Sequence, residues 1–122
     1  MSTPAEAMQR LDGLSKDLGS LSSLLAEVNR ALEPVQEQYE QFLDDFETGL
    51  WFRHETEGAK LPSADMRIRL AHKAMSPELL GQYRGLTNKR DRLRKAISDK
   101  KADVDAWRSM LSALKSEMEA TR

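Results

Sequence analysis

An unbroken stripe of apolar residues, spaced alternately three and four positions apart, runs through the first third of the chain. Its eleven positions are Leu11, Leu14, Leu18, Leu21, Leu25, Val28, Leu32, Val35, Tyr39, Phe42 and Phe46. A mean spacing of 3.5 residues keeps these side chains on the face that one α-helix turns toward another, with left-handed supercoiling. The stripe therefore predicts a coiled-coil helix over residues 4–48, about 68 Å long at 1.5 Å per residue.

Residues with helix-capping character stand at both ends of this predicted helix. Ser2 or Thr3 can cap its first turn, and Pro4 suits the first helical position. Gly49 marks the expected end. Pro34 lies inside the stripe, where a proline costs about 3 kcal/mol because it removes a backbone donor and clashes with the preceding turn. Since the stripe keeps its phase beyond this residue, we expect a kink there, with a helix break as the alternative.

A second stripe with the same spacing lies in the last third of the chain. Its twelve positions are Leu79, Tyr83, Leu86, Arg90, Leu93, Ile97, Lys100, Val104, Trp107, Leu111, Leu114 and Met118. Ser76, Pro77 and Glu78 combine a capping hydroxyl, a proline suited to the first position and an acid near the positive end of the helix dipole. These residues predict a second long helix over 77–120.

Residues 49–75 connect the two long helices. Gly58–Pro62 is predicted as a loop, and Ser63 as the cap of a short helix that ends near Met75. One side of this short helix carries Met66, Leu70 and Ala74. The order of elements favours an all-α fold, an antiparallel helical hairpin that forms a single domain over residues 1–122.

Further apolar residues lie beside both stripes and widen the apolar face of each helix. They are Leu24, Ala31, Leu43 and Leu50 on the first helix and Leu80, Ala96 and Met110 on the last. A lone hairpin would leave much of this face in water. We therefore expect a homodimer, in which two hairpins form a four-helix bundle.

Five carboxylates on the first predicted helix repeat the spacing of three and four residues on the side away from the apolar stripe. They are Glu33, Glu37, Glu40, Asp44 and Glu47. The line that they form is about 21 Å long. One interpretation is a solvated face that keeps the protein in solution. The other is an anionic surface for a basic partner, either the last helix of a second subunit or a nucleic-acid-binding protein.

Large aromatic side chains lie next to a cation where the first helix is expected to end. Trp51, Phe52 and Arg53 have the composition of binding hot spots. We therefore join them to the line of carboxylates in one predicted partner-binding site. The alternative is that the aromatic residues cover the end of the hairpin core against the short helix.

The two halves of the chain differ in charge, with a net −8 over residues 1–57 and a net +7 over residues 58–122. Residues 84–101 alone contain eight Lys or Arg against two Asp. Five of these eight cations, including Arg90 and Lys100 on the stripe, are expected to face the partner helix, whereas a nucleic-acid-binding helix directs most of its cations at phosphates. Nucleic acid is therefore the alternative partner. Its predicted site is Arg84, Lys89, Arg92, Arg94 and Lys95.

Residue types that support catalysis or metal binding are sparse. The chain has no Cys and no Gly-rich phosphate loop, and its two histidines, His54 and His72, lie on different elements without ligand spacing. We therefore predict a non-enzymatic protein that needs no metal and no cofactor. No apolar run approaches the ~20 residues of a membrane span, and no apolar segment of a signal peptide is found. We expect a cytoplasmic protein that does not contact membranes.

The segment Trp107–Lys115, which follows a basic helix with heptad spacing, resembles the ends of small helical coiled-coil accessory proteins encoded by bacteriophages. The resemblance implies an accessory factor that acts by binding a host or phage protein, and it assigns no functional residue. Together with the acidic line, it favours a protein-interaction module that works as an adaptor or an inhibitor. A nucleic-acid-binding accessory protein and a structural spacer or scaffold are the alternatives.

Overall fold

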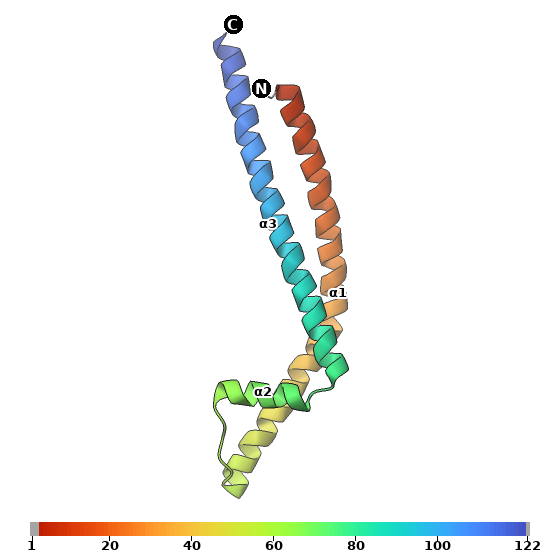
Figure 1. Cartoon of the computed structure of the whole chain (residues 1–122), viewed down its shortest axis with the longest axis vertical. Helices are drawn as coiled ribbons and strands as arrows, with labels where there is room; N and C mark the ends of the chain where they lie inside the picture. Colours follow the sequence, from red (N-terminus) through yellow and green to blue (C-terminus); the bar gives the residue numbers. More distant parts are fainter. Residues whose placement is uncertain (1–2, 122) are drawn as a thin grey trace. The chain divides into compact units, whose positions relative to one another are not determined.

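The computed structural model describes residues 3–121, which form three α-helices joined by short segments. The helices are α1 (Pro4–Glu57), α2 (Ala64–Ala74) and α3 (Pro77–Ala120) (Figure 1). Their contacts group into two compact units. The first unit combines α1 as far as Glu27 with α3 from Arg90 onward, and the second unit spans Val28–Lys89. The predicted all-α hairpin is confirmed, because the two long helices pack against each other in both units.

The first turn of α1 is closed by a reciprocal pair of hydrogen bonds. The backbone N–H of Glu6 donates to the Thr3 hydroxyl at 3.1 Å, and the backbone N–H of Thr3 donates to the Glu6 carboxylate at 3.1 Å. Together these two bonds form a capping box, which satisfies backbone donors that have no partner inside the helix. Thr3 is therefore the cap that the structure shows, and Ser2 lies outside the described residues.

The end of α1 lies nine residues beyond the predicted position. The helix continues through Pro34 and through Gly49, and it ends at Glu57. The prediction of an end at Gly49 was wrong because a glycine inside a helix costs only about 1 kcal/mol, whereas helices commonly end before a residue with positive φ. Gly58 supplies that conformation with a φ of 68°. The break considered at Pro34 does not occur.

The other two helices begin where the capping residues predict. The Ser63 hydroxyl accepts a hydrogen bond from the Met66 backbone N–H at 3.3 Å, and α2 starts at the next residue after Ser63. The Ser76 hydroxyl accepts one from the Leu79 backbone N–H at 3.4 Å, and α3 starts at Pro77. Both hydroxyls satisfy donors of a first helical turn. The predicted bounds of α3 are confirmed, and α2 ends one residue earlier than expected.

In the first unit, α1 and α3 run antiparallel with their apolar stripes facing each other. Leu14 and Val104 are buried, and Ala7 is fully enclosed at 0% exposure. The Lys100 ammonium lies 3.3 Å from the Asp17 carboxylate, so one of the two basic stripe residues forms an ion pair across the helices. The aliphatic stem of such a lysine can follow the apolar stripe while its charged end reaches a carboxylate at the rim.

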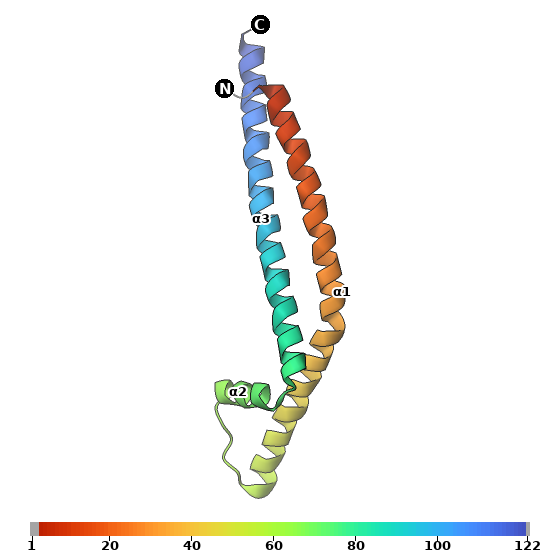
Figure 2. The same ribbon diagram turned by 45° about the vertical axis from the view of Figure 1, so that its right-hand side comes forward.

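In the second unit, α2 runs crosswise to α1 and the first turns of α3 pack beside α1 (Figure 2). The buried residues of this unit are Val28, Leu32, Ala71 and Met75. The inward side of α2 is therefore the one that carries Ala71, and not the side with Met66 and Ala74, which are both exposed. The Tyr39 and Tyr83 rings stack with their centroids 3.7 Å apart, which joins the two stripes.

Burial follows the predicted stripes closely. All eleven stripe positions of α1 are buried or half-buried, and on α3 Met118 is the one exposed member of the twelve.

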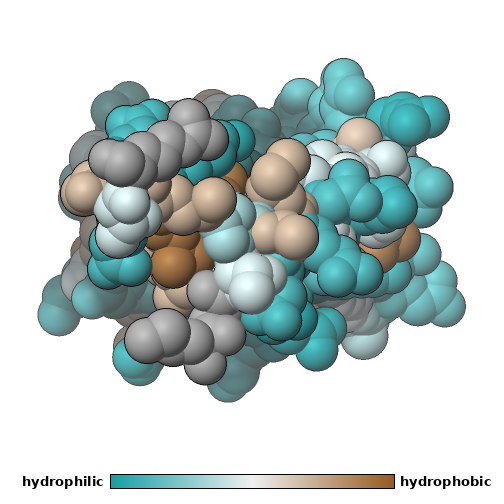
Figure 3. All heavy atoms as spheres, turned by 90° about the horizontal axis from the view of Figure 1, so that it is seen from above, coloured by the Kyte–Doolittle hydropathy of each residue, from teal (hydrophilic) through white to brown (hydrophobic). Residues whose placement is uncertain are grey.

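The visible surface in an end-on view is mostly hydrophilic, with apolar side chains between polar ones (Figure 3). None of the helices described over residues 3–121 combines the length and the apolarity that a bilayer crossing requires.

Candidate interaction site

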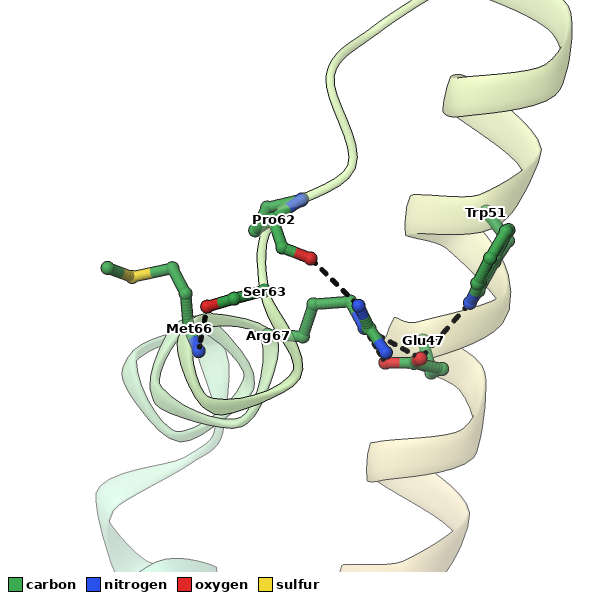
Figure 4. Close-up of polar contacts among 6 residues, drawn as sticks. All are labelled: Glu47, Trp51, Pro62, Ser63, Met66 and Arg67. Carbon is green, nitrogen blue, oxygen red and sulfur yellow. Dashed lines mark hydrogen bonds and ion pairs between the residues drawn. The ribbon is translucent and has the colours of Figure 1, made fainter.

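An ion pair joins Arg67 of α2 to Glu47 of α1, one of the predicted partner-binding residues (Figure 4). The Arg67 Nε donates to both carboxylate oxygens of Glu47, at 2.8 and 3.0 Å. The Arg67 Nη1 donates to the Pro62 carbonyl at 2.8 Å, and the Trp51 indole N–H donates to the same Glu47 carboxylate at 3.1 Å. The Arg67 guanidinium also lies 5.8 Å from the centre of the Trp51 ring, within the range of a cation–π contact.

This cluster uses two residues that sequence analysis assigned to partner binding. Glu47 accepts hydrogen bonds from both Arg67 and Trp51, so its carboxylate is engaged within the chain. Sequence analysis did not single out Arg67. A signal was present, because Ala64, Arg67 and Ala71 follow the helical spacing of three and four residues on the inward side of α2.

The other four carboxylates of the predicted line are exposed on the outer side of α1. We call this set the acidic ridge, and its members are Glu33, Glu37, Glu40 and Asp44. Within residues 3–121, no ion pair of the structure includes any of them. Glu40 accepts one hydrogen bond, from the Gln36 amide at 3.0 Å. The acidic ridge is therefore a run of carboxylates without cationic partners in the described part of the chain.

The predicted aromatic contact residues lie on the last turns of α1, which the structure shows as helix. Phe52 is 64% exposed and Trp51 is 43% exposed, and Arg53 is exposed beside them. We call these three residues the aromatic tip. The alternative that they cover the core was wrong for Phe52. α1 extends eight residues past Gly49, so these residues lie on helical turns beyond the predicted end. Trp51 donates to Glu47 on the same helix, and Glu47 pairs with Arg67 of α2.

A groove in the second unit runs along α1 and reaches the start of α3. Its volume is about 490 Å³. It is lined by Pro34, Glu37, Gln38, Gln41, Phe42, Asp45 and Leu79. Three of these residues are apolar, two carry carboxylates and none is basic. We call this feature the acidic groove, and it shares Glu37 with the acidic ridge.

Both histidines have identifiable partners. The Nδ1 of His54 lies 2.7 Å from the Ala59 carbonyl oxygen, which can only accept, so Nδ1 carries the proton and donates. The Nε2 of His72 lies 2.7 Å from the Tyr39 hydroxyl. His72 therefore helps to hold α2 against α1, a role that sequence analysis missed because His72 and Tyr39 are 33 residues apart. In the described chain, no three metal-ligating side chains converge on one point.

The residues predicted for nucleic-acid binding are all exposed. Arg84 and Lys89 belong to the second unit, and Arg92, Arg94 and Lys95 belong to the first. None of the five is part of an ion pair among residues 3–121. Nucleic acid as the partner therefore stays an alternative prediction.

The environment of Tyr39 makes its hydroxyl harder to ionise. Burial raises the pKa of Tyr39 above its ordinary value of 10.0, and the Tyr83 hydroxyl raises it further, while the Arg84 guanidinium acts in the opposite direction. The neutral hydroxyl is therefore preferred in the folded state, where it can donate to the Nε2 of His72. Because the folded protein holds this proton more tightly than the unfolded chain, the contribution of Tyr39 to stability should be fully present below pH 10. It should be lost as the pH rises through the raised pKa.

A spectroscopic titration tests this expectation. The ultraviolet absorbance of phenolate should reveal a component that titrates above pH 10.0, and Tyr39→Phe should remove it and leave the signal of Tyr83 alone. Urea denaturation at rising pH should show a smaller alkaline loss of stability in Tyr39→Phe than in the wild type. If Tyr39 titrates at its ordinary value, it is not buried against Tyr83 in solution.

No protein family model, no curated protein and no solved structure matches this chain.

Proposed function

We propose that this protein is a non-enzymatic interaction module that binds a basic protein partner through the acidic ridge and the aromatic tip. One observation carries the proposal. Four exposed carboxylates project from consecutive turns of α1, with no cation paired to them in the described chain, and Phe52 is exposed on the same helix. A partner with Lys or Arg side chains around an apolar residue complements both features.

The arrangement of the acidic ridge has a cost for the isolated chain. Glu33 and Glu37 are four residues apart, as are Glu40 and Asp44, so each pair projects from adjacent turns of one helix. Like charges at this spacing destabilise a helix by about 0.2–0.5 kcal/mol per pair. A basic partner would relieve this repulsion, and the relief adds to the free energy of binding.

The aromatic tip provides the apolar part of the proposed contact. Large aromatic side chains supply most of the binding energy in many interfaces, whereas charges at the rim mainly accelerate association and select the partner. Phe52 has the greatest exposed fraction of the large apolar side chains in the described chain. The Glu47 carboxylate holds Trp51 in place, so the tip is partly ordered before a partner binds.

A charge-reversal variant tests the proposal. The triple variant E37K/E40K/D44K should bind a synthetic amphipathic helical peptide of Leu and Lys about tenfold or more weakly than the wild type. Exposed ion pairs contribute about 0.2–1 kcal/mol each, and reversal replaces attraction with repulsion at three of them. Fluorescence anisotropy of the labelled peptide measures the change, and circular dichroism shows whether the helices persist.

The matched control makes the same change in net charge at another place on the chain. Asp99, Asp105 and Glu119 are exposed on the outer side of α3. The variant D99K/D105K/E119K should bind the Leu and Lys peptide within about twofold to threefold of the wild type, since only long-range charge has changed. If both variants lose the same affinity for the peptide, the loss is due to the change in net charge and not to the acidic ridge. Full binding by E37K/E40K/D44K would contradict the proposal and favour a spacer without a discrete site.

A further inference from the structure

We propose that a second copy of this chain occupies the acidic groove, through a basic edge on its α3. This inference rests on the proposed function, because it identifies one basic partner for the acidic face of α1. The basic edge consists of Arg94 and Lys101, which line a second groove in the first unit. The observations that carry the proposal are the opposite charges of the two grooves and the similar spacing of their charged residues.

The acidic groove combines an apolar floor with a negative rim. Phe42 and Leu79 are half-buried and contribute apolar surface from α1 and α3. Glu37 and Asp45 provide the carboxylates, and the one polar contact of the Asp45 carboxylate in the described chain is a hydrogen bond from the Gln41 amide at 2.9 Å. An occupant of this groove therefore needs aliphatic surface together with positive charge.

The basic edge has the converse character. Arg94 and Lys101 line a groove of about 340 Å³ together with Leu25, Ile97 and Ser98. Both cations are exposed, and neither takes part in an ion pair within residues 3–121. Long basic side chains can lay their aliphatic stems on apolar surface while the charged ends reach carboxylates. Arg94 and Lys101 thus offer the two kinds of surface that the acidic groove needs.

The charged residues of the two surfaces are spaced alike along their helices. Glu37 and Asp45 are eight residues apart on α1, which corresponds to about 12 Å along the helix axis. Arg94 and Lys101 are seven residues apart on α3, which corresponds to about 10.5 Å. Both cations of one copy can therefore meet both carboxylates of another copy when the helices lie alongside.

The charge of the whole chain is compatible with such an association. The net charge is −1, so two copies repel each other weakly, although the chain concentrates acidic residues in one half and basic residues in the other. Exposed ion pairs are weak and are screened by salt. The association should therefore be weak and should respond strongly to ionic strength.

Analytical ultracentrifugation of the full chain tests the proposal. In about 0.1 M salt, the weight-average mass should rise with protein concentration toward twice the chain mass or more. In about 1 M salt it should fall toward the chain mass, because the Debye length shortens from about 10 Å to about 3 Å. The variants E37K/D45K and R94E/K101E should each associate about tenfold or more weakly than the wild type, because each turns two attractive pairs into repulsive ones.

Ultracentrifugation of a mixture of the two variants tests whether these two surfaces contact each other. The lysines of E37K/D45K complement the glutamates of R94E/K101E, so the mixture should regain the association that each variant has lost. A control, D105K/E119K, reverses two exposed acids outside both grooves and should associate like the wild type. Failure of the mixture to associate, with both variants folded, would overturn the contact between these two surfaces.

The outcomes separate this inference from the proposed function. R94E/K101E keeps all four residues of the acidic ridge, so it should bind the Leu and Lys peptide like the wild type even though it no longer self-associates. A wild-type chain that stays at the chain mass in low salt at every concentration would overturn self-association alone. If the wild-type chain does not bind the Leu and Lys peptide, the proposed function is overturned instead.

Discussion

Leu32→Ala is expected to lower the free energy of unfolding by about 2–5 kcal/mol, the cost of removing a large side chain from a packed core. Leu32 is 3% exposed and belongs to the small set of buried residues in the second unit. The set contains one other α1 residue, Val28. Few buried side chains can therefore move into the cavity that the substitution leaves. Most of the cost should therefore appear as a lower urea midpoint, with the slope of the transition unchanged.

A second leucine on the same helix provides the control for this experiment. Leu24 is 44% exposed, so Leu24→Ala removes the same atoms from a position that is already partly in water. We expect it to cost less than about 1 kcal/mol. Equal costs for the two variants would show that the stripe of α1 does not face inward, and this result would contradict the fold.

Ala71→Glu is expected to destabilise the second unit by about 3 kcal/mol or more. Ala71 is 2% exposed and lies on the inward side of α2. A glutamate there overfills the contact with α1 and also places a carboxylate in apolar surroundings, and both effects are costly. Hydrogen exchange should show loss of protection in α2, and a protease should cut the segments that flank α2 faster than in the wild type.

Ala74→Glu is the matched control, because it makes the same substitution on the same helix at an exposed position. Its effect on stability should stay within about 0.5 kcal/mol, as for most surface changes. Strong destabilisation by Ala74→Glu and tolerance of Ala71→Glu would mean that α2 presents its other side to α1.

The helices themselves followed from local patterns in the chain. The spacing of Leu11 through Phe46 predicted which side of α1 is buried, because the period of an α-helix places such residues on one face whatever they contact. Ser63 and Ser76 predicted the starts of α2 and α3 because a capping hydroxyl acts on backbone atoms within the same turn. The predicted end at Gly49 was wrong because the sequence contains two glycines at which α1 could end. Only Gly58 has a positive φ.

The candidate site could be predicted only in part. The acidic ridge was visible as spacing, since a helix displays residues three and four apart on one side. The engagement of Glu47 by Arg67 was not visible, because these residues are 20 positions apart and meet only when α2 packs on α1. The exposure of Phe52 likewise depends on where α1 ends and on what α2 covers.

Sequence alone determined the helical character of this protein and the buried stripes, since both depend on neighbours within a few turns. It also determined the separation of charge between the halves, which is a matter of composition. Tertiary packing decided which side of α2 faces α1, which carboxylate of the predicted line is paired, and where the acidic groove opens beside Leu79. These features join residues that are tens of positions apart. Their free energies depend on burial and on distances that no local pattern records.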